Sequence, residues 1–277
     1  MRQLLINMTR PAITRPMTAF GVLFLLTIVI FAALSPWIAP YPPDVIDPVN
    51  RLQPPGPGHL LGTDHFGRDT FSRIVYGARL ALLIGVGVVL FALATGVPIG
   101  VLSALFPRLG VVLMRMVDVL MSFPSLLLAL GLIVILGQGV FNAILAIGLI
   151  YLTTTARIVY GVALRLKQEP FVEAARSSGA GTWWIVTRHI LPNMISPLLV
   201  QASFVFAFAQ LGAASLDFLG LGAPPEIPSW GNMLTSAQEL IWDAPALAIY
   251  PGALIFLTVI AFNFLGDGLR DAADPYK

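Results

Sequence analysis

Five stretches of this chain carry no charged side chain. Each is longer than the about 20 apolar residues that a helix needs to cross the roughly 30 Å hydrocarbon core of a bilayer. This pattern predicts an integral membrane protein. The stretches are 16–43, 80–107, 119–156, 189–216 and 244–266.

The composition agrees with that prediction. Only 11% of the 277 residues are charged, whereas soluble globular chains carry about 25%. So few charges cannot cover the surface of a water-soluble protein, which excludes a cytosolic enzyme, a disordered tail and a nucleic-acid binder. The chain has no cysteine, so it has no disulfide framework, thiolate metal site or cysteine nucleophile.

The third stretch, 119–156, is too long for one crossing, because as a straight helix it would extend about 57 Å. Gly137-Gln138-Gly139 interrupts it with residues that favour turns. We therefore expect two helices there, which gives an all-α fold with six transmembrane helices.

The first stretch follows Arg2, Arg10 and Arg15, as the apolar part of a signal peptide follows basic residues. Its apolar run is longer than the about 7–15 residues of a cleavable signal. We expect it to be retained as the first span.

Lysine and arginine concentrate in the cytoplasmic loops of membrane proteins. With the N-terminus in the cytoplasm, twelve of the 16 basic residues fall inside and four outside, and six spans return the C-terminus to the cytoplasm as well. The inside residues are Arg2, Arg10, Arg15, Arg108, Arg115, Arg157, Arg165, Lys167, Arg176, Arg188, Arg270 and Lys277, and the outside residues are Arg51, Arg68, Arg73 and Arg79.

This orientation defines the parts of the chain. A cytoplasmic tail, 1–16, precedes a membrane domain, 17–277. We expect external loops at 44–79 and 217–243 and a cytoplasmic segment at 157–193. Arg108 and Arg115 are expected in a short cytoplasmic loop between the second and third spans.

Several kinds of chemistry are excluded. Lys167 and Lys277 are the only lysines and neither follows a glycine, so the chain has no ATP-binding P-loop. His59 and His65 share one loop without a third ligand at a recognised spacing, so we expect no metal site. The second to sixth spans hold no ionisable residue in their charge-free cores, which disfavours an ion-coupled transporter.

Gly96 and Gly100, four residues apart in the second span, allow another helix to approach closely. Pro98 between them could bend the helix. Ordinary helix packing is the favoured interpretation, and a gating role is the alternative.

The polar segment 168–184 is the most informative part of the chain. Its pattern predicts a short helix, a break at Gly179 and a second helix that runs toward Pro192. Ala174 and Ala175 give the first helix a face of small side chains, against which a partner surface can pack closely. Glycine adopts positive φ at low cost, so Gly179 can turn the chain. An amphipathic linker at the membrane interface explains the same pattern equally well.

Six residues in this segment and shortly after it carry a resemblance to a known family: Glu173, Ala174, Ala175, Gly179, Leu191 and Pro192. With this spacing the segment resembles the EAA loop of the permeases of ATP-binding cassette (ABC) importers. His189 is a departure, since that position is usually isoleucine. The run Arg188-His189-Ile190-Leu191-Pro192-Asn193 is nevertheless similar to a form found in the peptide/nickel branch of the family.

The resemblance extends over residues 17–275. It is strongest to the second permease, or C component, of peptide/nickel transporters. The matching stretches are 61–79, 218–222, 228–231, 261–271 and Asp274-Pro275.

The resemblance implies a permease in the cytoplasmic (inner) membrane of a bacterium that forms half of a translocation pathway. A sister permease would supply the other half, and two ATP-binding subunits or domains would hold ATP and magnesium. An extracytoplasmic binding protein would deliver the substrate, and lipid would surround the spans. The chain itself would be no enzyme and hold no cofactor, and its EAA loop would seat in a cleft of the ATPase.

The resemblance also implies that the external loops face the binding protein, and a purely structural role is the alternative. Di- or oligopeptides are the expected substrates, with nickel chelates, glutathione or oligosaccharides as alternatives. A membrane receptor without transport is the competing function from another class. The candidate docking residues are Thr63, Asp64, Gly67, Arg68, Asp69 and Trp230.

Overall fold

The computed structural model describes residues 15–272, and in that range every regular element is a helix. Five helices are long and apolar enough to cross a membrane, and one bent pair supplies a sixth candidate crossing. The predicted all-helical membrane fold is therefore confirmed. The elements are α2 (Pro16–Ile38), η1 (Pro48–Asn50), α3 (Thr70–Leu105), α4 (Pro107–Met121), α5 (Ser125–Leu136), α6 (Val140–Lys167), α7 (Pro170–Ser177), α8 (Thr182–Ile185), η2 (Val186–Ile190), α9 (Leu191–Phe218), α10 (Trp230–Gln238) and α11 (Ala246–Ala272).

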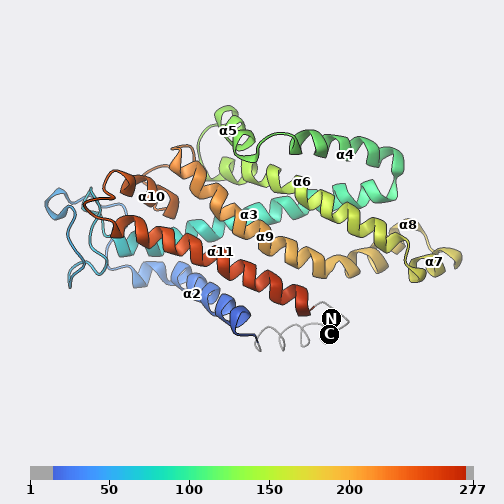
Figure 1. Cartoon of the computed structure of the whole chain (residues 1–277), viewed down its shortest axis with the longest axis horizontal. Coiled ribbons are helices and arrows are strands. Elements are labelled where there is room, and N and C mark those ends of the chain that lie inside the picture. The colour runs from blue at the N-terminus through green and yellow to red at the C-terminus, as the bar shows by residue number, and fades with distance from the viewer. Residues whose placement is uncertain (1–14, 273–277) are drawn as a thin grey trace.

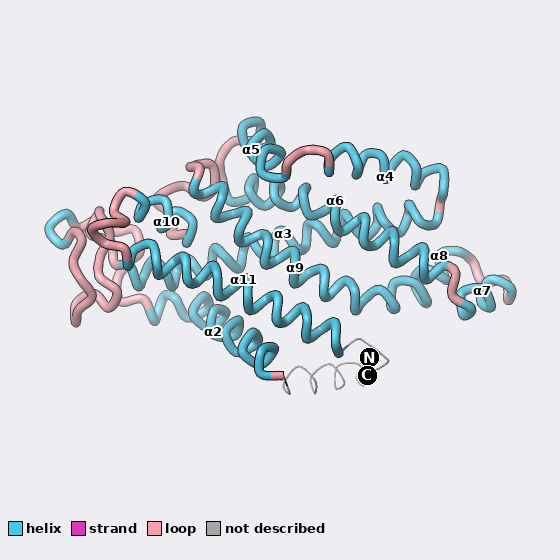
Figure 2. Tube along the Cα trace, in the orientation of Figure 1, coloured by secondary structure: helices cyan, strands magenta, loops and turns pink. Residues whose placement is uncertain are grey.

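The long helices lie side by side along one axis, with α3, α6 and α9 packed on one another (Figure 1). α2 and α11 cover one side of this group, and α4 and α5 cover another. Irregular chain gathers at the two ends (Figure 2). We call the end with α7 and α8 the hairpin end, and the end with α10 and the 39–69 loop the loop end.

α2 begins and α11 ends toward the hairpin end (Figure 1), where Arg15 forms an ion pair with Asp271. This arrangement requires an even number of passes along the bundle, as expected for six spans. Residues 1–14 of the expected tail, with Arg2 and Arg10, lie outside the described residues, as do Asp274-Pro275 and Lys277.

The third span differs from the expectation. The predicted break at Gly137-Gln138-Gly139 is confirmed, because α5 ends at Leu136 and α6 begins at Val140. The span itself begins earlier, at Pro107, and consists of α4 and α5, which meet at an angle of 93°. Pro124 explains this second break, since proline disfavours helix at the residue before it and lacks an N–H.

The expectation of a loop containing Arg108 and Arg115 is also wrong, because helix α4 already begins at Pro107. Pro107 occupies the first position of α4, where a proline is favourable, so only Phe106 separates this helix from the end of α3 at Leu105. Both arginines therefore lie on a helix, which packs along α3 and α6. Asp118 of α4 forms an ion pair with Arg157 of α6 and holds the two helices together.

Helix α3 extends beyond its charge-free stretch, because it starts at Thr70 within the expected loop 44–79. Asp69 caps it by accepting a hydrogen bond from the Ser72 backbone N–H at 2.8 Å. The second expected external loop, 217–243, likewise contains a helix, α10, which is capped by Ser229.

Gly96 and Gly100 lie where α3 packs against α6. A Cβ atom on Gly100 would come within 2.6 Å of a Val159 methyl group and 2.7 Å of the Ala156 carbonyl oxygen. A Cβ atom on Gly96 would meet Thr155 at 2.9 Å. The two glycines therefore allow the contact between α3 and α6 that the sequence pattern predicted.

We expect Gly100→Val to destabilise the helix bundle by about 1–3 kcal/mol, because the backbone of α6 must move to make room. The measurement is the melting temperature of the detergent-extracted protein. Gly161→Val is the matched control, since Gly161 lies on α6 and a Cβ atom there would have no neighbour within 4 Å. Equal melting temperatures for the two variants would contradict the close packing.

Candidate functional site

The hairpin end has the predicted helix–glycine–helix form. α7 begins at Pro170 and ends at Ser177, and Gly179 follows with a φ of +84°. Gly179 N–H donates to the Arg176 carbonyl and Ala180 N–H donates to the Ala175 carbonyl, both at 3.0 Å. These two hydrogen bonds form a Schellman motif, which needs a left-handed residue at the glycine position. The predicted turn at Gly179 is thus explained by its conformation.

The second helix of the hairpin continues into the membrane bundle through a π-helical turn, η2. There the Leu191 N–H donates to the Val186 carbonyl, five residues earlier. Pro192 explains this widening, because it has no N–H and its ring would clash with the Arg188 carbonyl in a regular α-helix. The Leu-Pro pair therefore lies at the start of α9, where it causes the π-helical turn that connects the hairpin to this helix.

The hairpin is firmly attached to the bundle. Val172 of α7 and Ile190 of η2 are almost completely buried, in one apolar cluster with residues of α3, α6 and α9. The Lys167 ammonium donates to the Ala104 carbonyl at 3.1 Å and links the ends of α6 and α3. A force on the hairpin would therefore reach three long helices directly.

The opposite face of the hairpin is uncovered. Glu173, Ala174, Gly179 and Pro192 are exposed, and Ala175 and Leu191 are partly buried. Three exposed aromatic residues, Phe171, Trp183 and Trp184, surround this face. Exposed aromatic side chains of this kind at one end of the bundle are typical of an interface.

His189 is a residue of the hairpin whose role the sequence did not predict. Its ring lies 5.0 Å from the ring of Trp184 and 5.8 Å from that of Phe171, so it connects the two helices of the hairpin. The Nε2 atom is buried and has no hydrogen-bond partner among the described residues. In the sequence, the departure from the usual isoleucine at this position was the sign that His189 has a role of its own.

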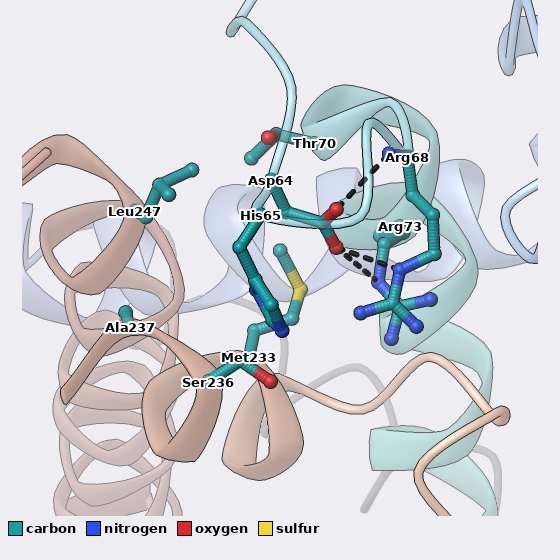
Figure 3. Close-up of a pocket in the computed structure, with 9 residues that line it drawn as sticks. All are labelled: Asp64, His65, Arg68, Thr70, Arg73, Met233, Ser236, Ala237 and Leu247. Carbon is teal, nitrogen blue, oxygen red and sulfur yellow. Dashed lines mark hydrogen bonds and ion pairs between the residues drawn. The ribbon is translucent and has the colours of Figure 1, made fainter. Parts of the chain in front are cut away.

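The loop end is built around a buried carboxylate. Asp64 accepts a hydrogen bond from Arg68 Nε at 2.7 Å and lies 3.9 Å from Arg73 Nε (Figure 3). It also accepts from the backbone N–H groups of Phe66 and Arg68. The Arg73 guanidinium donates to the Pro43 carbonyl at 2.9 Å. The cluster therefore fastens the 39–69 loop to the start of α3.

Asp69 and Thr63 form the second part of this attachment. Asp69 accepts from the Ser72 hydroxyl at 2.7 Å and lies 2.9 Å from His59 Nδ1. The Gln53 N–H donates to the Thr63 hydroxyl at 2.9 Å. Gly67 has a φ of +77°, and a Cβ there would clash with the Asp47 carbonyl.

α10 is held by two contacts that join distant parts of the chain. Trp230 Nε1 donates to the Ile74 carbonyl at 3.1 Å, and its ring fills the space left by Gly77 on α3. Asp217, at the end of α9, accepts from the Ser229 hydroxyl and the Ala223 N–H, both at 2.7 Å. The sequence analysis did not predict the role of Asp217; its position directly after a charge-free stretch was the signal.

The six loop residues that the sequence selected are thus brought to one end of the molecule, but all six are buried. They maintain the shape of the loop end, and their side chains do not form its surface. The residues are Thr63, Asp64, Gly67, Arg68, Asp69 and Trp230.

His65 borders a small cavity between the 39–69 loop and α10 (Figure 3). Burial lowers the pKa of His65, and the nearby Asp64 carboxylate only partly opposes this shift. The neutral ring is therefore favoured in the folded loop. Within residues 15–272, no group of three His, Cys, Asp or Glu side chains could hold a metal ion.

Comparison with known proteins assigns the family. The family described as "Binding-protein-dependent transport system inner membrane component" matches residues 96–276. The chain belongs to this family. The N-terminal TM domain of oligopeptide transport permease C also matches, at residues 13–55. The protein is therefore a multi-pass permease, the C component of an ABC importer in a bacterial inner membrane, and not the ATPase of that importer.

Curated relatives resemble the permease over nearly its whole length. A putative peptide transport system permease of Brucella suis is 44% identical over 255 residues, which are 92% of this chain and 86% of the relative. The di/tripeptide transport system permease DppC of Pseudomonas aeruginosa is 42% identical, with the same coverage of both chains. The glutathione transport system permease GsiD of Pectobacterium atrosepticum is 42% identical and covers 91% of this chain and 85% of its own.

The fold of the permease also matches that of a solved transporter. An inward-facing structure of the MetNI methionine ABC transporter superposes with a TM-score of 0.61 at 21% identity. The match covers 74% of the permease and 97% of the matched chain. The ABC importer permease fold predicted from the sequence is therefore confirmed.

We expect Asp64→Ala to loosen the loop end, because it leaves two buried arginines without their carboxylate. Removing one partner of a buried ion pair costs about 3–5 kcal/mol. Limited proteolysis of the 39–69 loop in membrane vesicles measures the effect. Glu226→Ala, an exposed position of the other loop, is the control. Equal cleavage rates would show that the Asp64 cluster does not hold the loop.

Proposed function

We propose that the permease forms half of the translocation pathway of an importer for di- or oligopeptides. Its orientation places the hairpin end in the cytoplasm and the loop end outside. A sister permease supplies the other half, two ATP-binding subunits or domains hold ATP and magnesium, and an extracytoplasmic binding protein delivers the peptide. The single observation that carries the proposal is the exposed hairpin, which is seated on three long helices.

The hairpin suits the transfer of movement from an ATPase. Glu173, Ala174 and Ala175 lie on a short helix whose other side, at Val172, is buried in the bundle. Small side chains permit close contact, and exposed Arg176 and Arg188 suit acidic groups on a partner. Because the hairpin is packed onto α3, α6 and α9, a push on it moves these helices as a body.

An apolar groove is the observation that supports a sister permease as partner. It has a volume of about 680 Å³ and lies between α5, α9, α10 and α11. Leu211, Phe218 and Phe256 on its walls are exposed. We propose that the sister permease and lipid cover this side. The loop end, stabilised by Asp64 and Asp69, faces the binding protein.

The substrate class rests on the relatives, several of which are named for peptides and two for glutathione, itself a peptide. Nickel chelates and oligosaccharides remain the alternative substrates. A receptor without transport would have no use for an ATPase-coupling hairpin. The test is reconstitution of all subunits in liposomes, with ATP-dependent uptake of a labelled tripeptide as the readout. ATP hydrolysis that the binding protein does not stimulate, together with no uptake, would overturn the proposal.

We expect Gly179→Trp to abolish uptake while the variant remains in the membrane. Gly179→Ala is the sharper test, because it adds little bulk but forces a left-handed conformation that costs about 1–2 kcal/mol. Gly181→Ala is the matched control, since Gly181 has a φ of −70° and open space around it. Uptake should fall for Gly179→Ala and stay near normal for Gly181→Ala. Normal uptake with Gly179→Trp would contradict the coupling role.

A further inference from the structure

A second cavity opens between α5, α6 and α9. Its volume is about 200 Å³, and it shares Leu126, Leu211 and Ser215 with the large apolar groove. The two spaces are therefore adjacent on one side of the permease. The cavity differs from the groove because three of its lining residues, Ser125, Tyr151 and Ser215, carry hydroxyl groups.

The cavity lies near the middle of α6 and α9. Tyr151 is eleven residues from the start of α6 at Val140, and Phe208 is ten residues from the end of α9 at Phe218. Both of these helix ends lie on the side of the bundle that faces the loop end (Figure 1). At 1.5 Å per residue, each ring lies about 15 Å along its own helix from that helix end. This distance is about half of the roughly 30 Å thickness of a hydrocarbon core.

The hydroxyl groups are available to a ligand in complementary ways. No hydrogen bond from the Tyr151 hydroxyl to another described residue is found, so this group can donate. Ser215 donates to the Leu211 carbonyl at 2.8 Å, and its oxygen can still accept. The Tyr151 ring stacks on Phe208, with 6.5 Å between the ring centroids, and this contact limits the movement of the ring that carries the hydroxyl.

The chemistry of the cavity indicates the kind of group it receives. None of its lining residues carries a charge at neutral pH, and the remainder of the wall is apolar. A peptide amide has one donor and one acceptor and no charge, and it matches a wall with both functions. A wall without charge also makes no strong bond that would trap a passing peptide.

We propose that this cavity is a transient site for the peptide backbone halfway through the membrane. The Tyr151 hydroxyl donates to a peptide carbonyl, and Ser215 accepts from a peptide N–H. The site rests on the proposed function, because it requires peptide to pass this side of the permease. It assigns to α6 and α9 a direct role in contacting the substrate.

The test uses the complete importer in liposomes, with a labelled tripeptide and the ATP hydrolysed measured together. Tyr151→Phe removes one oxygen atom and keeps the stacked ring. We expect the number of peptides moved per ATP to fall about threefold to tenfold, as for the loss of one hydrogen bond. Tyr160→Phe is the matched control, because Tyr160 lies on the same helix against a different apolar cluster.

A second variant fills the cavity. A Cβ atom on Gly212 would lie 3.6 Å from Ile147, an ordinary contact, so Gly212→Leu adds its bulk to the cavity with little clash at the first atom. We expect this variant to reach the membrane and to lower the number of peptides moved per ATP more than Tyr151→Phe does.

The outcomes separate this inference from the proposed function. A normal transport ratio for both Tyr151→Phe and Gly212→Leu overturns the inference and leaves the importer intact. An equal loss for Tyr160→Phe and Tyr151→Phe also overturns it, because the effect would then be structural. Absence of uptake by the unaltered importer overturns the proposed function itself.

Discussion

Backbone hydrogen bonding in the absence of water is the constraint on which the rest of this structure depends. In hydrocarbon every N–H and C=O group needs a partner within the protein, so a spanning chain of this composition is helical. Irregular segments are accordingly concentrated at the two ends of the bundle. The break at 122–124 and the π turn before Leu191 both adjoin prolines, which cannot donate the missing hydrogen bond.

The two ends of the permease solve different physical problems. At the loop end, buried ion pairs and capping carboxylates such as Asp64, Asp69 and Asp217 fasten irregular chain to helix ends. At the hairpin end, polar, small and aromatic residues are left exposed while buried apolar residues secure the other face. One end is therefore internally satisfied, and the other offers a surface to a partner.

The sequence predicted the spans and the hairpin well because their signals are local. Charge-free runs, the break at 137–139 and the positive φ at Gly179 each depend on a few neighbouring residues. The third span was predicted, but its start and its kink were not, because the criterion of charge-free length excluded Arg108 and Arg115 from a helix. Pro107 and Pro124, which mark the true boundaries of its first helix, were present in the sequence but were not used.

The sequence by itself determined the membrane class, the even number of crossings and the position of the hairpin, since hydropathy and glycine conformation act residue by residue. Only the tertiary structure decided which polar residues of the loops are buried. Trp230 finds its acceptor at Ile74, and Asp217 finds Ser229, through contacts between segments far apart in the chain. The cavity beside Tyr151 was decided in the same way, because its walls come from three helices whose arrangement no local pattern encodes.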